Sequence, residues 1–267
     1  MTVLLHISDT HFGTELAGPT QALAALVRSE RPGLLVLSGD VTQRARRRQF
    51  RAARQFLDDL DVPAVLALPG NHDIPLFNLL ARVFNPYGGY RRWLSRELEP
   101  THEDEHWLVV GVDTTRRYRH KDGEVSRGQV ERTVQRLRAA RPGQVRIVVT
   151  HQPVLAVRDE DRRNLLHGRE AAVRAWVEAG ADFLLGGHIH LPYVRSLREA
   201  YPGLPREAWA VQAGTAISHR IRDGIANSVN ILRRNGDGST CMAERWDWDG
   251  RTGAFTKVLQ RPLPLSR

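Results

Sequence analysis

The fold is decided by the first thirteen residues, Met1-Thr-Val-Leu-Leu-His-Ile-Ser-Asp9-Thr-His11-Phe-Gly13. Residues 3–7 are a short apolar run, which predicts a buried strand. This strand delivers Asp9 and His11 onto a loop that contains Gly13. Side chains two positions apart at a strand end can converge on one cation, and a carboxylate with an imidazole suits a divalent transition metal. The pair alone is more often an ordinary polar turn, so the metal hypothesis depends on the rest of the chain.

The composition favours an enzyme of the cytoplasm. The chain has 267 residues, 41% of them hydrophobic, which is enough to bury a sizeable core. It has no run of eighteen or more apolar residues, so no transmembrane helix is expected, and its start does not resemble a secretory signal. Cys241 is the only cysteine, which excludes an internal disulfide and fits a reducing compartment.

The formal net charge of +9 raises the hypothesis of a nucleic acid or another anionic partner. Almost all of the positive charge is arginine, however, since Lys121 and Lys257 are the only lysines. Such dominance can reflect codon bias, so a nucleic-acid partner stays open but is not favoured. The arginines of the predicted helix 44–60 either face phosphate or form a solvated surface, and the solvated surface is the favoured interpretation.

Metal-capable residues follow one predicted strand after another. A helix at 19–30 leads to a strand at 34–37 that ends at Asp40, and the strand at 64–68 ends at Asn71, His72 and Asp73. Strands at 145–149 and 183–185 are followed by further histidines. Ligand sites of α/β sheets gather beyond the carboxyl ends of strands. This repetition indicates one shared site.

The organisation predicts a single domain over residues 1–267, with two packed sheets and flanking helices. Residues 74–105 are aromatic and contain Gly and Pro, and they are predicted to be an insertion or lid beside the site. From about residue 193 the chain is mostly β in character. The β-rich end could offer an edge for a homodimer.

The strand ends carry more ligand candidates than one metal ion needs. The set is Asp9, His11, Asp40, Asn71, His72, His151, His188 and His190. A two-metal site accommodates it, with one carboxylate shared by two ions about 3.5–4 Å apart. Asp40 is the natural bridge, because a carboxylate offers two oxygens and an imidazole one lone pair. Glycines before Asp40, Asn71 and His188 allow tight turns and close approach of the backbone.

The complete ordered set, Asp9-x-His11, Gly39-Asp40, Gly70-Asn71-His72-Asp73, His151 and Gly187-His188-Ile-His190, resembles the calcineurin-like metallophosphoesterase family. Residues 212–230 resemble the C-terminal motif of its class III cyclic-nucleotide phosphodiesterase branch. The resemblance implies an α/β fold of the α+β type. In this fold two mixed β-sheets flanked by helices form a four-layer αββα sandwich, with the metal site at the top of the central sheets.

The resemblance also implies roles for single residues. Asp9, His11, Asp40 and His190 would hold the first metal, and Asp40, Asn71, His151 and His188 the second. The ions would be Mn, Fe or Zn, and a hydroxide between them would attack phosphorus in line. His72 would protonate the leaving oxygen, oriented by Asp73. His219 and Arg222 are candidates for substrate binding, whereas the remaining histidines, His6, His102, His106, His120 and His167, are expected to be structural or exposed.

The leading functional hypothesis is a dimetal phosphodiesterase acting on a small nucleotide such as a 3′,5′-cyclic nucleotide. A second is a nucleotide–lipid pyrophosphatase of the UDP-diacylglucosamine type, with residues 74–105 as an apolar cap over acyl chains. A third is a nuclease, favoured only by the net charge. A hypothesis of another class is an interaction module that keeps the fold without the chemistry. Such a module should have lost ligand residues, and this chain has kept them.

Overall fold

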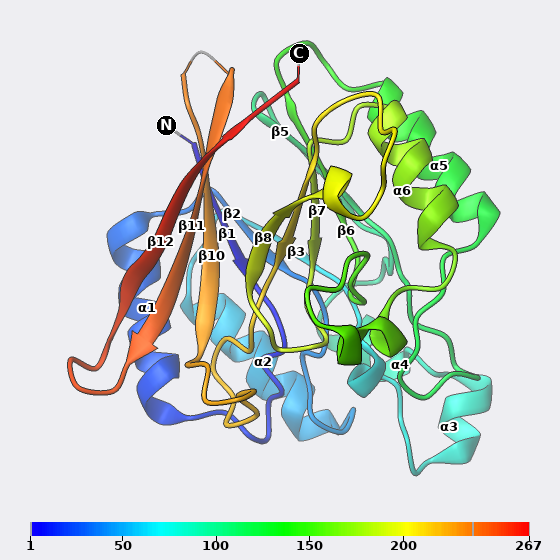
Figure 1. Ribbon diagram of the computed structural model, residues 1–267. Helices are drawn as coiled ribbons and strands as arrows, with labels where there is room; N and C mark the ends of the chain where they lie inside the picture. The colour runs from blue at the N-terminus through cyan, green and yellow to red at the C-terminus, as the bar shows by residue number, and fades with distance from the viewer. Residues whose placement is uncertain (1, 237, 267) are drawn as a thin grey trace.

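Two six-stranded sheets pack face to face in the computed structural model, which describes residues 2–236 and 238–266 (Figure 1). The first sheet has the order β12-β11-β10-β1-β2-β3. Its strands are β1 (Thr2–Ile7), β2 (Leu34–Leu37), β3 (Ala64–Ala67), β10 (Ser228–Arg234), β11 (Thr240–Asp249) and β12 (Ala254–Pro264). β1, β2 and β3 run parallel, and the last three strands extend the sheet antiparallel from β1.

The second sheet has the order β4-β5-β6-β7-β9-β8. Its strands are β4 (Thr101–Glu103), β5 (Trp107–Gly111), β6 (Val145–Val149), β7 (Phe183–Gly186), β8 (Tyr193–Ser196) and β9 (Trp209–Gln212). The four inner strands are parallel, and both edge strands are antiparallel to their neighbours. Both sheets are therefore mixed.

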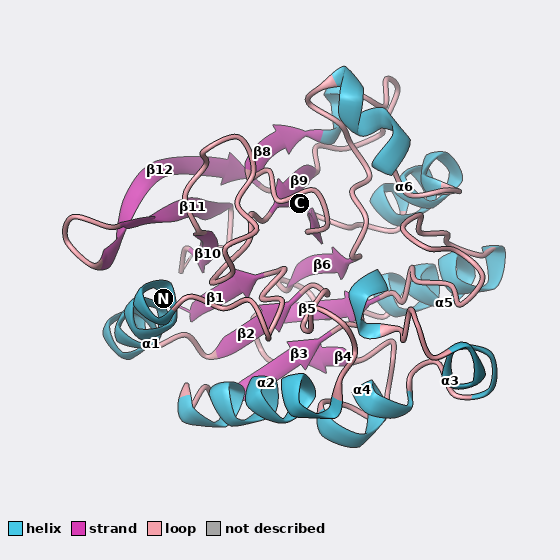
Figure 2. Cartoon of the chain, turned by 90° about the horizontal axis from the view of Figure 1, so that it is seen from below, coloured by secondary structure: helices cyan, strands magenta, loops and turns pink. Residues whose placement is uncertain are grey.

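Helices cover the outer face of each sheet (Figure 2). α1 (Ala17–Glu30) and α2 (Arg47–Asp59) lie against the first sheet, and α5 (Arg127–Arg138) and α6 (Arg169–Glu178) against the second. α1 and α6 each bury an apolar stripe with helical spacing; in α1 the stripe is Pro19, Ala22, Leu23, Leu26 and Val27. This arrangement confirms the predicted αββα sandwich.

α2 begins later than the sequence predicts, at Arg47 rather than near Arg44. The Gln49 side chain accepts hydrogen bonds from the backbone N–H groups of Arg44, at 3.0 Å, and Arg46, at 3.3 Å. Ala45 has a left-handed φ of 51°. The residues before α2 therefore form a turn capped by a helix side chain, which periodicity alone does not reveal.

Three apolar clusters separate the four layers. The central one joins the inner faces of both sheets, with Leu4 and Val36 from one and Ile147 and Val211 from the other. The other two lie between the sheets and their helices. Cys241 is buried in the central cluster and takes part in no disulfide, as expected of a small apolar residue.

Residues 74–105 contain α3 (Leu79–Phe84), α4 (Gly88–Trp93) and β4. α4 is anchored to the first sheet, because the fully buried Tyr90 donates its hydroxyl to the carbonyl of Ala67 at 2.6 Å. α3 buries none of its residues. α3 therefore projects from the body of the molecule (Figure 1).

None of the helices within residues 2–236 and 238–266 is long and apolar enough to cross a membrane.

Candidate functional site

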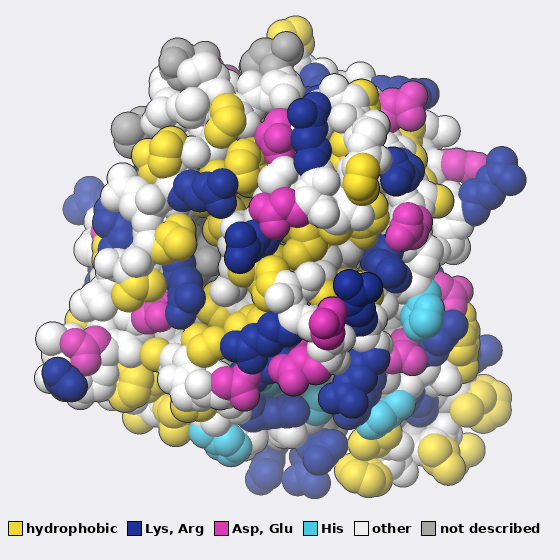
Figure 3. All heavy atoms as spheres, in the orientation of Figure 1, with side chains coloured by type: hydrophobic (Ala, Val, Ile, Leu, Met, Phe, Trp, Pro, Cys, Tyr) yellow, Lys and Arg dark blue, Asp and Glu magenta, His cyan; other side chains and the backbone are white. Residues whose placement is uncertain are grey.

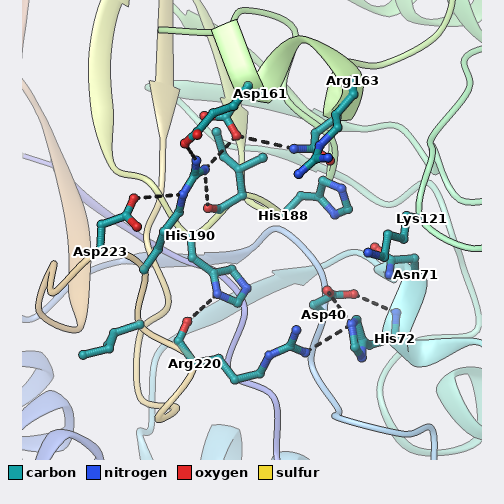
Figure 4. A pocket seen from close by; sticks show the side chains of 15 residues that line it. Asp40, Asn71, His72, Lys121, Asp161, Arg163, His188, His190, Arg220 and Asp223 are labelled. Atoms are coloured by element: carbon teal, nitrogen blue, oxygen red, sulfur yellow. Dashed lines mark hydrogen bonds and ion pairs between the residues drawn. The ribbon is translucent and has the colours of Figure 1, made fainter. Parts of the chain in front are cut away.

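The loops that follow five parallel strands meet at one end of the sandwich. They follow β1, β2 and β3 in the first sheet and β6 and β7 in the second. A cavity of about 600 Å³ opens there. Its lining includes Asp40, Asn71, His72, His188, His190 and Arg220 (Figure 4). The carboxyl ends of the strands thus bring the sequence-predicted residues to one place.

The first ligand group consists of Asp9, His11 and His190, whose donor atoms lie within 4.8 Å of one another. His190 Nε2 lies 3.1 Å from Asp9 Oδ1 and 3.1 Å from His11 Nε2. Asp9 and His11 are fully buried. Two imidazole nitrogens and a carboxylate oxygen facing one point are the donors that a divalent transition metal takes.

The second group consists of Asp40, His151 and His188. His151 Nε2 lies 3.3 Å from Asp40 Oδ1. His151 Nε2, His188 Nδ1 and Asn71 Oδ1 are buried and have no hydrogen-bond partner among the described residues. Buried polar atoms almost always find a partner. Three such atoms around one carboxylate fit a bound cation.

Asp40 lies between the two groups. Its Oδ2 is 3.8 Å from His11 Nε2 in the first group, and its Oδ1 faces His151 in the second. One oxygen therefore faces each group, which is the geometry a bridging carboxylate requires. The side-chain clusters fit two divalent metal ions.

The backbone at the site is strained. Asp9, His11, Asp40, His188 and His190 all have left-handed φ angles, between 44° and 74°. Non-glycine residues seldom adopt this conformation, which costs about 1–3 kcal/mol each. The sharp turns aim successive side chains into the site. The sequence motifs do not predict these left-handed conformations.

The glycines act mainly through close approach, as the sequence predicts. A Cβ on Gly70 would lie 2.1 Å from the backbone nitrogen of Asp40, and one on Gly187 would lie 2.4 Å from Asp9 Oδ2. Gly39 also needs its left-handed φ of 109°. Side chains at these positions would force the ligand-bearing loops apart.

The two carboxylates attract positive charge to the cluster. Burial alone would lower the pKa of His151, but Asp40 and Asp9 outweigh it and raise this pKa to about 9. Burial would also lower the pKa of His190, but the charge of Asp9 and its hydrogen bond outweigh burial and raise this pKa. Burial lowers the pKa of His188 to about 3 and holds that of His11 well below its usual value. His11 and His188 are therefore held as neutral imidazoles, whereas the carboxylates favour protonation of His151 and His190, and a bound metal ion would have to displace those protons.

The ligands are held by outer contacts. His151 Nδ1 donates to the Ser38 carbonyl at 2.8 Å and His190 Nδ1 to the Arg220 carbonyl at 2.5 Å, so in each ring Nε2 is directed into the site. The Thr215 hydroxyl donates to the Asp9 carbonyl at 2.6 Å. Asn227 donates to the Ser218 carbonyl at 2.8 Å. Residues 212–230 therefore support the first ligand group from outside.

His72 lies at the edge of the cavity and contacts Arg220. Its Nδ1 donates to the Gln43 carbonyl at 2.9 Å, and its Nε2 lies 3.2 Å from Arg220 Nη1 and 4.0 Å from Asp40 Oδ2. Arg220 also donates to Gln43 Oε1 at 3.0 Å. Figure 4 shows the Arg220 guanidinium pointing toward the His72 ring.

The expectation that Asp73 orients His72 differs from the structure. The Asp73 carboxylate accepts hydrogen bonds from the backbone of Val41, Thr42 and Gly70, at 2.8–3.0 Å, and from the Thr42 hydroxyl. Burial, together with the charge of Asp40, raises its pKa to about 6. Asp73 joins the loops after β2 and β3, whereas the Gln43 carbonyl orients the His72 ring.

The two predicted substrate-binding residues occupy different environments. Arg222 lines the cavity, but its guanidinium pairs with Glu160 and with the buried Asp161, at 2.7 Å to Asp161. His219 is exposed and is not among the residues lining the cavity. The neighbouring Arg220, which sequence reasoning missed, reaches the site instead. In the sequence, only its position between His219 and Arg222 pointed to Arg220. Which of these side chains faces the cavity depends on the turn of the backbone, which the sequence pattern does not show.

Comparison with known proteins agrees with this geometry. The model of the calcineurin-like phosphoesterase family matches residues 2–192. A probable cyclic nucleotide phosphodiesterase of Synechococcus sp. is 26% identical over 209 residues, which cover 72% of this chain and 74% of that protein.

Among solved structures, a dimetal phosphatase from Danio rerio superposes with a TM-score of 0.67 at 13% identity, and 99% of each chain is covered. Purple acid phosphatase PPD1 from yellow lupin superposes with a TM-score of 0.73 at 11% identity over 98% of this chain. This chain spans about half, 53%, of the lupin protein. These similarities show a shared fold.

The fold and the donor clusters define a metal-dependent phosphoric ester hydrolase. The chain belongs to the calcineurin-like phosphoesterase family.

Proposed function

We propose that the cavity hydrolyses a phosphodiester of a small nucleotide, with a 3′,5′-cyclic nucleotide as the first substrate to test. The main support is the position of three buried atoms without hydrogen-bond partners in the described part of the chain, Asn71 Oδ1, His151 Nε2 and His188 Nδ1. They lie near the contact between His72 and Arg220, at a cavity of about 600 Å³. A cavity of this size can hold a nucleotide. The name of the Synechococcus relative supports the substrate class.

In this proposal the two ligand groups each bind one divalent ion. Asp9, His11 and His190 hold the first, Asn71, His151 and His188 hold the second, and Asp40 is shared. Bound ions would neutralise phosphate charge and lower the pKa of the attacking water. The mixed nitrogen and oxygen donors suit Mn, Fe or Zn.

His72 belongs to the substrate side of the site in this proposal. It could join His11 and Asp40 as a further donor group, since their donor atoms also lie within 4.8 Å. Its ring, however, already has a partner for each nitrogen, the Gln43 carbonyl and the Arg220 guanidinium. Its side chain is 20% exposed, whereas those of His11 and His151 are fully buried. These contacts favour proton transfer over metal ligation.

Arg220 and His72 act in sequence on the substrate. A phosphodiester anion draws the guanidinium toward its non-bridging oxygens, because charge-assisted bonds to phosphate are stronger than a bond to a neutral imidazole. The released His72 Nε2 then faces the leaving oxygen and, once protonated, donates its proton there. The Gln43 carbonyl keeps the ring in position throughout.

A hydrolysis panel with Mn²⁺ tests the proposal. The substrates are 3′,5′-cyclic AMP, bis-p-nitrophenyl phosphate, p-nitrophenyl phosphate, a nucleotide pyrophosphate and single-stranded DNA. Turnover of the two diesters above the monoester is expected. Preference for the pyrophosphate would favour the nucleotide–lipid pyrophosphatase, and preference for DNA a nuclease. No hydrolysis of any substrate by metal-loaded protein would refute the proposal and leave an interaction module.

A further inference from the structure

A group of large apolar side chains is exposed on and beside α3. The α3 patch consists of Phe77, Leu79, Leu80, Val83 and Phe84, which are 77%, 69%, 73%, 48% and 81% exposed. Figure 3 shows hydrophobic side chains gathered at the lower right of the molecule, where Figure 1 places α3. Single exposed apolar residues are ordinary, but a contiguous cluster of this size marks an interaction surface.

The patch is held in place by the loop beside it. Arg82 donates to the carbonyls of Pro75, at 3.2 Å, and Arg119, at 2.7 Å. Arg117 donates to the carbonyl of Val83 at 2.5 Å. The same loop presents Tyr118, which is 68% exposed. The side chains of Arg82 and Arg117 thus fix the position of α3. The helix buries none of its residues, so packing within this chain does not explain why they are apolar.

The rim of the patch is basic. Arg82 and Arg117 donate to backbone carbonyls, and the Arg44 guanidinium lies 5.5 Å from the centre of the Phe77 ring. Among residues 2–236 and 238–266, no carboxylate forms an ion pair with any of these three arginines. No acidic residue occurs between Asp73 and Glu97. An apolar projection with a basic rim complements a surface that is apolar inside and anionic at its face.

The patch also lies next to the catalytic cavity. A second cavity of about 210 Å³ is lined by Arg44 from the rim, by Leu76, and by His72 and Arg220 from the site. A partner that binds the α3 patch would therefore lie beside this second cavity, which His72 also lines.

We propose that the α3 patch docks this protein onto an anionic lipid surface. Phe77, Leu80 and Phe84 enter the boundary between headgroups and acyl chains, and the rim arginines contact lipid phosphates. Apolar contact and charge contribute together, so binding requires both. Docking of the α3 patch does not depend on the substrate, since none of the patch residues lines either cavity.

Vesicle co-sedimentation of the full chain tests the proposal. Binding is expected to vesicles of phosphatidylcholine with phosphatidylglycerol, and much less to phosphatidylcholine alone. Binding should weaken as salt screens the arginines. The variant Leu80→Ser/Phe84→Ser should bind about 30-fold more weakly, because each large apolar side chain kept in water costs several-fold in partitioning.

A matched control comes from the other end of the molecule. Val258 and Leu259 on β12 are 54% and 39% exposed, and Val258→Ser/Leu259→Ser should bind vesicles like the unmodified protein. Both variants should hydrolyse bis-p-nitrophenyl phosphate in solution at the unmodified rate. This readout separates failure of docking from failure of the proposed function.

Three results would overturn the docking proposal. One is no binding to anionic vesicles, and another is equal loss in both double variants. The third is a concentration-dependent dimer in sedimentation velocity that Leu80→Ser/Phe84→Ser abolishes, without vesicle binding, which would make a second copy of the chain the occupant.

Discussion

Arg220→Met separates the guanidinium of Arg220 from its backbone role. The substitution leaves the carbonyl that accepts from His190 Nδ1 and removes the group that contacts His72 and Gln43. Arg220 is only partly buried, and methionine fills much of the space of its stem. We therefore expect the fold and the metal content to remain unchanged.

The expected fall in kcat/KM follows from the hydrogen bonds that the Arg220 guanidinium can make to the substrate phosphate. A hydrogen bond to a charged group is worth about 1.5–3 kcal/mol, and a guanidinium can give phosphate two. Arg220 gives up two existing contacts to do so, which offsets part of the gain. A net loss of about 2–3 kcal/mol in transition-state stabilisation corresponds to a fall in kcat/KM of about 30- to 150-fold.

Steady-state hydrolysis of bis-p-nitrophenyl phosphate with Mn²⁺ measures this loss, and elemental analysis confirms equal metal content. Arg222→Met is the matched control. Its guanidinium is engaged by Glu160 and Asp161, so truncation should lower Tm by removing the cationic partner of the buried Asp161, with a smaller effect on kcat/KM. If Arg220→Met keeps kcat/KM within about threefold of the unmodified enzyme, Arg220 does not contact the phosphate.

Three further outcomes are expected. Gly70→Ala should abolish activity and lower Tm because its Cβ would overlap the backbone of Asp40, whereas Gly33→Ala, with open space around it, should do neither; equal thermal melts would contradict this. Asn71→Ala should retain only one of the two metal ions by elemental analysis after dialysis, and full metal content would exclude Asn71 as a ligand. Burial raises the pKa of Asp113 to about 6, so its ionisation destabilises the fold as pH rises from about 4 to 6. Asp113→Asn should therefore gain about 3 kcal/mol in unfolding free energy relative to the unmodified protein between pH 4 and 7, and a difference independent of pH in urea titrations would refute it.

The fold and the metal-capable cluster could be predicted because they depend on local patterns. Short apolar runs predict the parallel strands, and the carboxyl ends of such strands meet at one edge of a sheet. Asp9, Asp40 and His151 therefore come together although they are far apart in the chain. The approach of Gly70 and Gly187 to the neighbouring carboxylates follows from the same convergence.

Side-chain direction in the loops could not be predicted. His219, Arg220 and Arg222 belong to one motif, but only the turn that the backbone takes sends Arg220 toward His72 and leaves His219 exposed. Asp73 follows His72 directly, yet its carboxylate accepts from the backbone of its own loop at Gly70 and of the neighbouring loop at Val41. Loop dihedrals depend on long-range packing, and one residue of offset reverses which side chain faces the site.

The layers of the fold, the order of the ligand-bearing strand ends and the donor types that suit a divalent metal can be inferred from local patterns, because strand periodicity and donor chemistry are local properties. The three-dimensional packing was needed to show which donor atoms lack partners, which arginine contacts His72 and which apolar residues of 74–105 are exposed. Those properties depend on contacts between loops from both sheets, which no local pattern contains.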